Sequence, residues 1–180
     1  MDFNFSWLPE LFKYDNRKSI EEYYNEVYEI FKRDFITSKP VLFGKNIGLQ
    51  KEPMVNGKPQ TFHHMTTEDI CNNKNKQSKL RNIAFDRCER IAWNRAIIDS
   101  GYVGLKIFRE TRSRNRKNLI IFFEEKDFVI VLREAPTYYV FITSYPIKYK
   151  NKKRQLQKSY EKYIKAETAS KKADSTLFLH

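Results

Sequence analysis

The chain has 180 residues, of which 41% are hydrophobic, so its length and composition fit one folded domain and exclude a disordered protein. It carries 34 basic and 22 acidic side chains, a formal net charge of +12, which favours a polyanionic partner, with nucleic acid as the leading candidate. No segment is apolar over a length that would span a bilayer, and no basic helix has an obvious lipid-binding face, so we expect no membrane partner.

The two cysteines, Cys71 and Cys88, do not form a CxxC motif. They allow one disulfide, but free thiols in a cytoplasmic chain are the preferred interpretation, and the N-terminus lacks the pattern of a signal peptide. A zinc site would have to combine Cys71 with His63 and His64, and this spacing matches no standard ligand set. We therefore expect no metal and no cofactor.

Residues 1–17 are rich in aromatic side chains, and we expect them to form an arm or short helix held against the core by Phe3, Phe5, Trp7 and Leu11. Ser19 followed by Glu22 is the signature of a capping box at a helix start. Apolar residues then recur at helical spacing, which predicts a helix over residues 20–36 that buries one face.

Residues 41–65 contain short apolar segments separated by glycines and prolines. The pattern predicts short strands and turns, because proline and glycine interrupt regular structure. The pair Asn56–Gly57 is a strong signal for a tight turn, so we expect a hairpin there.

His63 and His64 follow this region, and the remaining histidine, His180, is the last residue. Imidazole is the side chain that titrates near neutral pH without perturbation, so this pair is a candidate for acid–base chemistry. If the pair lies in a strand, the two rings point to opposite faces and only one enters a given site. The alternative is a histidine satisfied by its surroundings. Residues 66–69 resemble a helix start, and residues 72–79 are polar and are predicted to be an exposed loop.

Residues 81–100 are predicted to form a long, largely buried helix, closed by Gly101. At about 100° per residue, Arg87, Arg90 and Asn94 fall in one polar stripe of that helix. Arginines in such a stripe must meet a carboxylate, a carbonyl or a water-filled cleft. The alternative to a functional site is a set of salt bridges to neighbouring acidic residues.

Four apolar segments predict strands at Val103–Arg109, Asn118–Glu124, Phe128–Arg133 and Tyr138–Tyr145. Their short connections favour antiparallel neighbours, because a parallel crossover needs a dozen residues or more. In the last segment, alternation places Tyr139, Phe141, Thr143 and Tyr145 on one face. The pair Thr143 and Tyr145 would reach the end of that face, although a half-buried strand without chemistry fits them equally.

Basic residues gather in the connection at 111–117 and again after residue 148. Residues Gln155–Ala166 are predicted to be helical, with Leu156, Tyr160 and Tyr163 toward the core, and residues 167–180 are expected to be a loose basic tail. A solvated face is the alternative, but the density and single sign of the charge favour polyanion binding. The residues expected to bind RNA are Arg112, Arg114, Arg116, Lys148, Lys150, Lys152, Lys153 and Arg154.

These groups match the needs of a phosphodiester cut made without metal. Such a reaction requires a base for the ribose 2′-hydroxyl, an acid for the leaving oxygen, and cations or donors for the anionic phosphorane. Histidine, arginine, threonine and tyrosine can supply these parts.

Four blocks of the sequence, in order, resemble the phage- and toxin-associated branch of the barnase–EndoU–colicin–RelE group of RNases. The blocks are Thr61-Phe62-His63-His64-Met65, Asp86-Arg87-Cys88-Glu89-Arg90-Ile91-Ala92-Trp93 with Ile97-Ile98, the strand pair around Phe122–Leu132, and Ile142-Thr143-Ser144-Tyr145-Pro146. The resemblance covers residues 60 to 163. Each motif is short, and the order and spacing carry the similarity.

The resemblance implies a single-domain α+β nuclease in which N-terminal helices pack on a four-stranded antiparallel sheet. Residues 1–59 would be an extension of the domain and residues 60–166 its core. It also implies metal-independent RNA cleavage, with tRNA a common substrate, and an acidic immunity protein or antitoxin as partner.

By the same resemblance, His63 or His64 would act as base or acid. Arg87 and Arg90 would hold the phosphate, and Thr143 and Tyr145 would orient or protonate it.

Two functions therefore remain open from the sequence. The first is an RNase that acts as a toxin or growth inhibitor. The second is a non-catalytic nucleic-acid-binding protein, such as a phage accessory factor, that uses the same basic surface. Binding that weakens with salt is expected of both, whereas RNA cleavage is expected only of the first.

Overall fold

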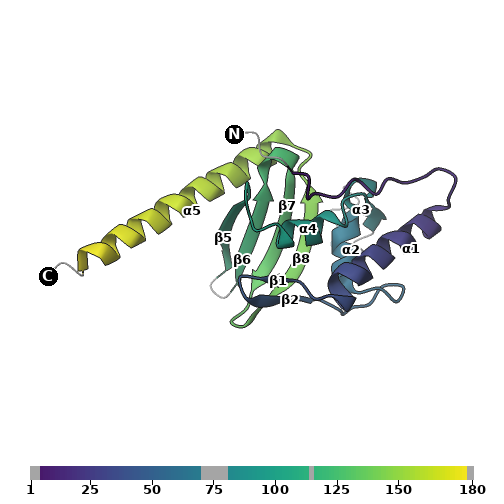
Figure 1. Ribbon diagram of the computed structural model, residues 1–180, viewed down its shortest axis with the longest axis horizontal. Helices are drawn as coiled ribbons and strands as arrows, with labels where there is room; N and C mark the ends of the chain where they lie inside the picture. Colours follow the sequence, from purple (N-terminus) through teal and green to yellow (C-terminus); the bar gives the residue numbers. More distant parts are fainter. Residues whose placement is uncertain (1–4, 70–80, 114–115, 178–180) are drawn as a thin grey trace, which may run out of the picture.

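Four adjacent strands of a mixed sheet overlap the predicted apolar strands in the computed structural model, which describes residues 5–69, 81–113 and 116–177, without the side chains of residues 112 and 171–177 (Figure 1). They are β5 (Lys106–Ser113), β6 (Arg116–Phe123), β7 (Phe128–Glu134) and β8 (Tyr138–Pro146). Each pairs antiparallel with the next, as predicted, because the connections are short. The fold is a mixed α+β domain.

The prediction of four strands was wrong, because the sheet among the described residues has six, in the order β1-β2-β8-β7-β6-β5. The two additional strands are β1 (Val41–Leu42) and β2 (Lys45–Leu49), which form an antiparallel pair. β2 also pairs with β8 in parallel, with Ile47 opposite Tyr139. A parallel pair requires a long crossover, and here the chain between residues 49 and 138 supplies it.

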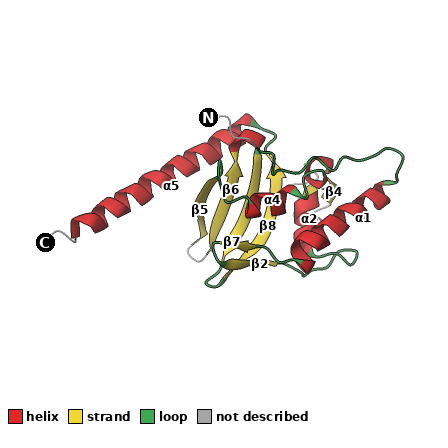
Figure 2. Ribbon diagram, in the orientation of Figure 1, coloured by secondary structure: helices red, strands yellow, loops and turns green. Residues whose placement is uncertain are grey.

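The sheet separates two hydrophobic clusters, because side chains alternate along each strand. In β6, Leu119, Ile121 and Phe123 belong to the larger cluster, whereas Ile120 and Phe122 belong to the smaller one. The larger cluster includes residues of α1 (Ile20–Phe31), α2 (Gln60–Thr66), α3 (Phe85–Cys88) and α4 (Trp93–Asp99), whereas α5 (Lys150–Leu177) packs on the smaller cluster. Figure 2 shows α4 in front of the sheet and α1 and α2 beside β8. The N-terminal arm joins the larger cluster through Phe5, Trp7 and Leu11, as predicted. Phe3 lies outside the described residues.

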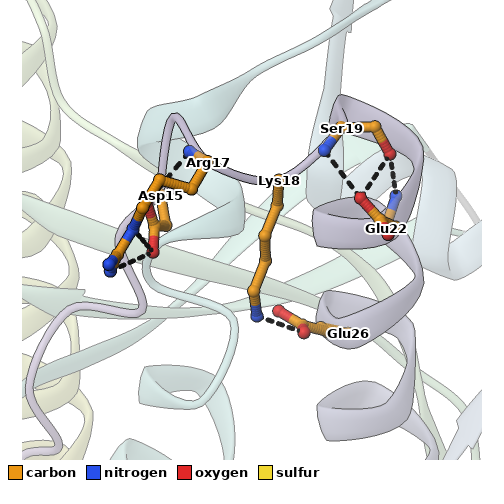
Figure 3. A network of polar contacts seen from close by, with 6 residues as sticks. All are labelled: Asp15, Arg17, Lys18, Ser19, Glu22 and Glu26. Carbon is orange, nitrogen blue, oxygen red and sulfur yellow. Dashed lines mark hydrogen bonds and ion pairs between the residues drawn. The ribbon is translucent and has the colours of Figure 1, made fainter.

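The helix α1 (Ile20–Phe31) begins at the predicted capping box. The Glu22 amide donates to the Ser19 hydroxyl at 3.1 Å, and the Ser19 amide donates to the Glu22 carboxylate at 2.7 Å (Figure 3). Lys18 pairs with Glu26 in the next turn, and Arg17 pairs with Asp15 just before the helix. The helix continues into a π-helical segment at Lys32–Thr37, so the helical stretch ends near the predicted residue 36.

The predicted single helix over residues 81–100 was wrong in its first part. The chain forms β4 (Arg81–Ile83), α3 (Phe85–Cys88), a turn and α4 (Trp93–Asp99), and β4 pairs with β3 (Thr67–Asp69). The predicted helix start at residues 66–69 is therefore wrong, because residues 67–69 form a strand. At the turn, the Asn94 side chain donates to the Ile91 carbonyl at 2.9 Å, and Arg90 donates to the Asp86 carbonyl at 2.7 Å. Such side-chain bonds to the backbone compete with helical bonding.

The alternation predicted for β8 is broken by a bulge, because Val131 pairs with Thr143 whereas Leu132 pairs with Phe141. Tyr139 and Phe141 belong to the larger cluster, but Tyr145 packs against the smaller one. Thr143 and Tyr145 therefore do not continue the face of Tyr139 and Phe141, which corrects the prediction.

The last helix, α5 (Lys150–Leu177), is longer than the predicted Gln155–Ala166. It packs on the smaller cluster through Leu156, Tyr160 and Tyr163, as expected. Residues 167–177, expected as a loose tail, continue the helix. In the described chain, no helix combines the length and the apolar character needed to cross a membrane.

Loss of the serine hydroxyl at the start of α1 should destabilise the protein. Ser19→Ala should lower the free energy of unfolding by about 1 kcal/mol, because the Glu22 amide loses its acceptor. Urea denaturation followed by circular dichroism measures this change. Ser159→Ala, inside α5, is the matched control and should be neutral or slightly stabilising, because alanine is the better helix former. An unchanged midpoint for Ser19→Ala would contradict the capping role.

Candidate active site: the histidine cleft

His63 and His64 lie in the short helix α2 (Gln60–Thr66), and the expected strand is absent at this position. Helical geometry separates neighbouring side chains by about 100°, so both imidazoles line one cleft and do not point to opposite faces. The helix is attached to the sheet by Thr61, whose buried hydroxyl donates to the carbonyl oxygens of Gln50 and Phe141, each at 3.3 Å.

The histidine cleft, as we name it, has a volume of about 890 Å³. Its walls come from α1, the turn segment before α2, α2 itself, β3 and β4. The turn segment contains the predicted hairpin, since Val55 and Lys58 exchange backbone hydrogen bonds and Asn56 and Gly57 have positive φ. The cleft is lined by Ile20, Glu21, Tyr24, Asn25, Pro53, Val55, Asn56, Lys58, Gln60, His63, His64, Thr67, Arg81 and Ile83.

The ring of His63 is fixed by the wall of the cleft. Its Nε2 lies 2.9 Å from the Val55 carbonyl oxygen, which can only accept, so Nε2 carries the proton. Its Nδ1 lies 3.5 Å from the Tyr24 hydroxyl, which is also 2.9 Å from the Thr66 hydroxyl. Burial raises the pKa of Tyr24 to about 12, so this phenol stays protonated and can donate a hydrogen bond.

The ring of His64 makes no hydrogen bond or ion pair to the residues that the structure describes, although it is half-buried. Burial lowers its pKa, and the positive charges of Arg81 and Arg87 lower it further, while Asp69 has the opposite effect. The pKa of His63 is also lowered, first by burial and then by Lys58 and Arg81. Both imidazoles are therefore neutral at neutral pH, which is the form required of a general base.

Two cations face the cleft, and protein contacts hold both of them in place. Arg81 donates to the Thr67 hydroxyl and carbonyl at 2.7 and 2.8 Å and pairs with Asp69 at 2.7 Å. The Lys58 ammonium donates to the Asn25 side chain at 3.1 Å and lies over the ring of Tyr24.

Arg87 and Thr143 contact the histidine pair through the backbone and do not enter the cleft. The His64 carbonyl oxygen accepts from Arg87 Nη1 at 3.1 Å and from the Thr143 hydroxyl at 2.8 Å. Arg87 also donates to the Thr67 carbonyl at 2.9 Å, and its guanidinium lies 5.6 Å from the centre of the Tyr145 ring. The structure thus brings Arg87, Thr143 and Tyr145 together behind α2, where they hold its end.

Arg90 does not join this group. It donates to the Asp86 carbonyl and lies over the ring of Trp93, 5.1 Å from its centre. The side chains of the predicted polar stripe, Arg87, Arg90 and Asn94, therefore donate their hydrogen bonds mainly to backbone carbonyl oxygens.

The basic residues expected to bind RNA fall into two groups. Lys148 pairs with Glu68 and Asp86, Lys153 pairs with Asp127, and Lys152 donates to Gln155. In contrast, the side chains of Arg116, Lys150 and Arg154 are exposed and have no partner within the described chain. Arg114 and the side chain of Arg112 lie outside the described part.

Tyr24, Lys58 and Arg81 were not identified from the sequence as parts of a site. Tyr24 belongs to the apolar stripe of α1, and Arg81 directly follows a polar segment, so neither has a distinctive local signal. Lys58 adjoins the predicted Asn56–Gly57 turn, but only the structure shows that this turn lies against α2.

The described residues include no group of three or more histidine, cysteine or acidic side chains that could hold a metal. Cys88 is a buried free thiol, and Cys71 lies outside the described part. A second, apolar cavity of about 620 Å³ beside β2 contains no histidine. The histidine cleft is therefore the better candidate for acid–base chemistry.

No protein-family model, curated protein or solved structure matches the chain. Support for the candidate site therefore comes from the geometry and the charges of the cleft. Its distinguishing feature is a neutral imidazole, that of His64, in a cleft that also holds two cations and a protonated phenol.

The lowered pKa values of His63 and His64 should make stability depend on pH. Below the ordinary histidine value of 6.5, the unfolded chain binds protons that the folded cleft resists. The contribution of the two neutral rings to the stability of the folded protein is therefore complete above pH 6.5. It is lost as the pH falls through the lowered histidine pKa values of the folded state.

Urea midpoints measured between pH 7.5 and 5 should therefore decrease, a window that lies above most carboxylate titration. The double variant His63→Gln, His64→Gln should show a flatter dependence. If the urea midpoint depended on pH equally in the wild-type protein and in the double variant, the two histidines would not be the source of the dependence.

The shared carbonyl of His64 should couple Arg87 and Thr143. Arg87→Met should cost about 2 kcal/mol of unfolding free energy, and Thr143→Val about 1 kcal/mol, because each removes a donor to a partly buried oxygen. In a double-mutant cycle the two losses should differ from additivity by about 0.5 kcal/mol or more. If the two losses of stability were strictly additive, or if the Arg87 variant were as stable as the wild-type protein, these residues would not position His64 through its carbonyl oxygen.

Proposed function

We propose that the protein is a metal-independent endoribonuclease that acts in the cytoplasm as a toxin or growth inhibitor, with the histidine cleft as its active site. The observation that carries the proposal is the position of His64, whose neutral ring has no hydrogen-bond partner in the described chain and shares the cleft with Arg81 and Lys58. A neutral base beside cations suits an anionic substrate that must lose a proton.

In this mechanism, His64 removes the proton of the ribose 2′-hydroxyl. The 2′-oxygen then forms a bond to phosphorus, and the bond from phosphorus to the 5′-oxygen breaks as that oxygen takes the proton of the Tyr24 hydroxyl, so that a 2′,3′-cyclic phosphate and a 5′-hydroxyl remain. The proton held by His64 returns to Tyr24 through solvent. Arg81 and Lys58 neutralise the phosphorane. The ring of His63, which is hydrogen-bonded to the Val55 carbonyl oxygen, orients the Tyr24 hydroxyl.

The residues expected to touch the phosphate take other roles in this proposal. Arg87 and Thr143 position His64 through its carbonyl oxygen, and Tyr145 packs against Arg87. Arg90 supports the turn between α3 and α4. The basic composition also suits an acidic immunity protein or antitoxin as an inhibitor, because opposite charge favours both association and inhibition of RNA binding.

A non-catalytic nucleic-acid-binding protein is the second candidate. The observation in its favour is that Arg116, Lys150 and Arg154 are exposed and unpaired although they lie outside the cleft. Cations in such positions can hold RNA without cutting it.

Cleavage of RNA without metal distinguishes the two candidates. In single-turnover reactions with total tRNA in EDTA, the wild-type protein should produce 2′,3′-cyclic phosphate ends. His64→Gln should slow this reaction by about 10²- to 10⁴-fold, the usual contribution of a general base. Arg90→Lys, a variant outside the cleft, is the control and should keep most of the activity.

The pH dependence adds a second readout to the same reaction. The rate should decrease with falling pH below 6.5, as His64 becomes protonated, and should be level above it. RNA that is bound tightly but left intact would support the second candidate. A requirement for a divalent cation would indicate a different nuclease chemistry.

A further inference from the structure

The outer face of α5 carries four basic residues in one row: Arg154, Lys158, Lys162 and Lys165. Their spacing of four, four and three residues keeps them on one side of the helix at about 100° per residue. That side is opposite to the side of Leu156, Tyr160 and Tyr163, which packs on the sheet. The row extends over about 16 Å of helix, given a rise of 1.5 Å per residue.

All four side chains are exposed, and none makes a hydrogen bond or an ion pair within the described chain. Other lysines of the same region differ, since Lys153 pairs with Asp127 and Lys148 pairs with Glu68. Glu161 adjoins the row, but no ion pair joins it to a described side chain. The row is therefore a line of positive charge, with Glu161 as its one acidic neighbour, on a helix that Leu156, Tyr160 and Tyr163 attach to the domain.

Such a row is unfavourable for the helix that carries it. Like charges one turn apart destabilise a helix by about 0.2–0.5 kcal/mol for each pair, and Glu161, one turn from Lys158 and Lys165, offsets only part of this repulsion. The repulsion disappears when an anionic ligand supplies negative charges at a similar interval. Phosphates follow one another along one strand of a nucleic-acid helix at about 3.4 Å of axis, so a row of about 16 Å can meet several successive phosphates.

We propose that the row on α5 is a binding site for the phosphate backbone of one RNA strand, separate from the histidine cleft. The choice of RNA follows from the proposed function and deepens it by adding a second contact with the same substrate. A membrane surface suits the row less well, because an interfacial helix must present an apolar face to lipid, and Leu156, Tyr160 and Tyr163 are packed on the sheet.

The position of α5 has a consequence for the substrate. Figure 1 shows α5 extending beyond the sheet, away from α1 and α2, which form walls of the cleft. An RNA that contacts both the row and the cleft must therefore be long enough to pass from one side of the domain to the other. A dinucleotide is too short to contact the row and the cleft at the same time.

Salt-dependent binding tests the row directly. The probe is a 20-nucleotide 2′-O-methyl RNA, which has no free 2′-hydroxyl and cannot be cut by the proposed reaction. Fluorescence anisotropy gives the dependence of affinity on salt, whose slope decreases by about 0.7 for each lost contact to a single strand. Lys158→Gln with Lys162→Gln should lower the slope by about 1.4 and weaken binding at 0.15 M salt by about tenfold.

The matched control is Lys13→Gln with Lys39→Gln, two exposed lysines far from α5 in the chain, which makes the same change in net charge. This control should keep the slope of the wild-type protein. Equal slopes for the two double variants would overturn the proposal, as would loss of binding to phosphatidylserine vesicles with RNA binding unchanged. The row variant should also retain its midpoint of thermal unfolding, since removing repulsion does not destabilise α5.

The outcome is independent of whether the protein is an enzyme. Failure of the wild-type protein to cut tRNA would reject the ribonuclease proposal but leave the salt slope to report on the row. If the row variant bound RNA with the salt dependence of the wild-type protein and the wild-type protein cut tRNA efficiently, the proposed binding site on α5 would be rejected and the ribonuclease proposal would stand. If both proposals hold, the row variant should cut long RNA with a raised KM and cut a dinucleotide at the wild-type rate.

Discussion

The carbonyl oxygen of His64 accepts hydrogen bonds from Arg87 and from Thr143, and the rest of the candidate site depends on these two bonds. A helix leaves its last carbonyl oxygens without partners, and α2 has only seven residues, too few to be stable alone. Donors from α3 and β8 satisfy the end of this helix from behind. Both imidazoles are thereby held at the opening of the cleft by residues that do not enter it.

Much of the fold could be predicted from signals that act within a few residues. The Ser19–Glu22 capping box, the Asn56–Gly57 turn and the apolar segments of β6 and β7 are of this kind. The pairing of β2 with β8 could not be predicted, because it joins segments that are remote in sequence. The segment at 81–100 shows a different limit. Hydrophobic periodicity reports which residues are buried, but the side-chain bonds of Arg90 and Asn94 decide where helical bonding stops.

For the candidate site, the sequence identified side chains with suitable chemistry, but it did not show which of them lie close together in the folded protein. The histidines could be found because few side chains titrate near neutral pH. Tyr24 and Lys58 could not, because only the packing of α1 and the hairpin around α2 brings them to the cleft. Arg87 had the right chemistry for a phosphate ligand, yet its Nη1 donates to the carbonyl oxygens of His64 and Thr67 and its side chain does not line the cleft. Net charge likewise predicted a basic surface without showing which lysines are already paired.

The parallel pairing of β2 with β8 also bears on how the protein is made. It closes a long loop, and contacts of such sequence separation form late in folding because the entropy of closure must be overcome first. The backbone of β8 accepts from Thr61, and its Thr143 donates to His64, so α2 lacks these two contacts before β8 is in place. Synthesis proceeds from the N-terminus, and the histidines and Arg81 therefore leave the ribosome well before β8. A nascent chain would carry every side chain of the cleft before β8 supplies its two contacts to α2, which delays full assembly of the cleft until β8 has been synthesised.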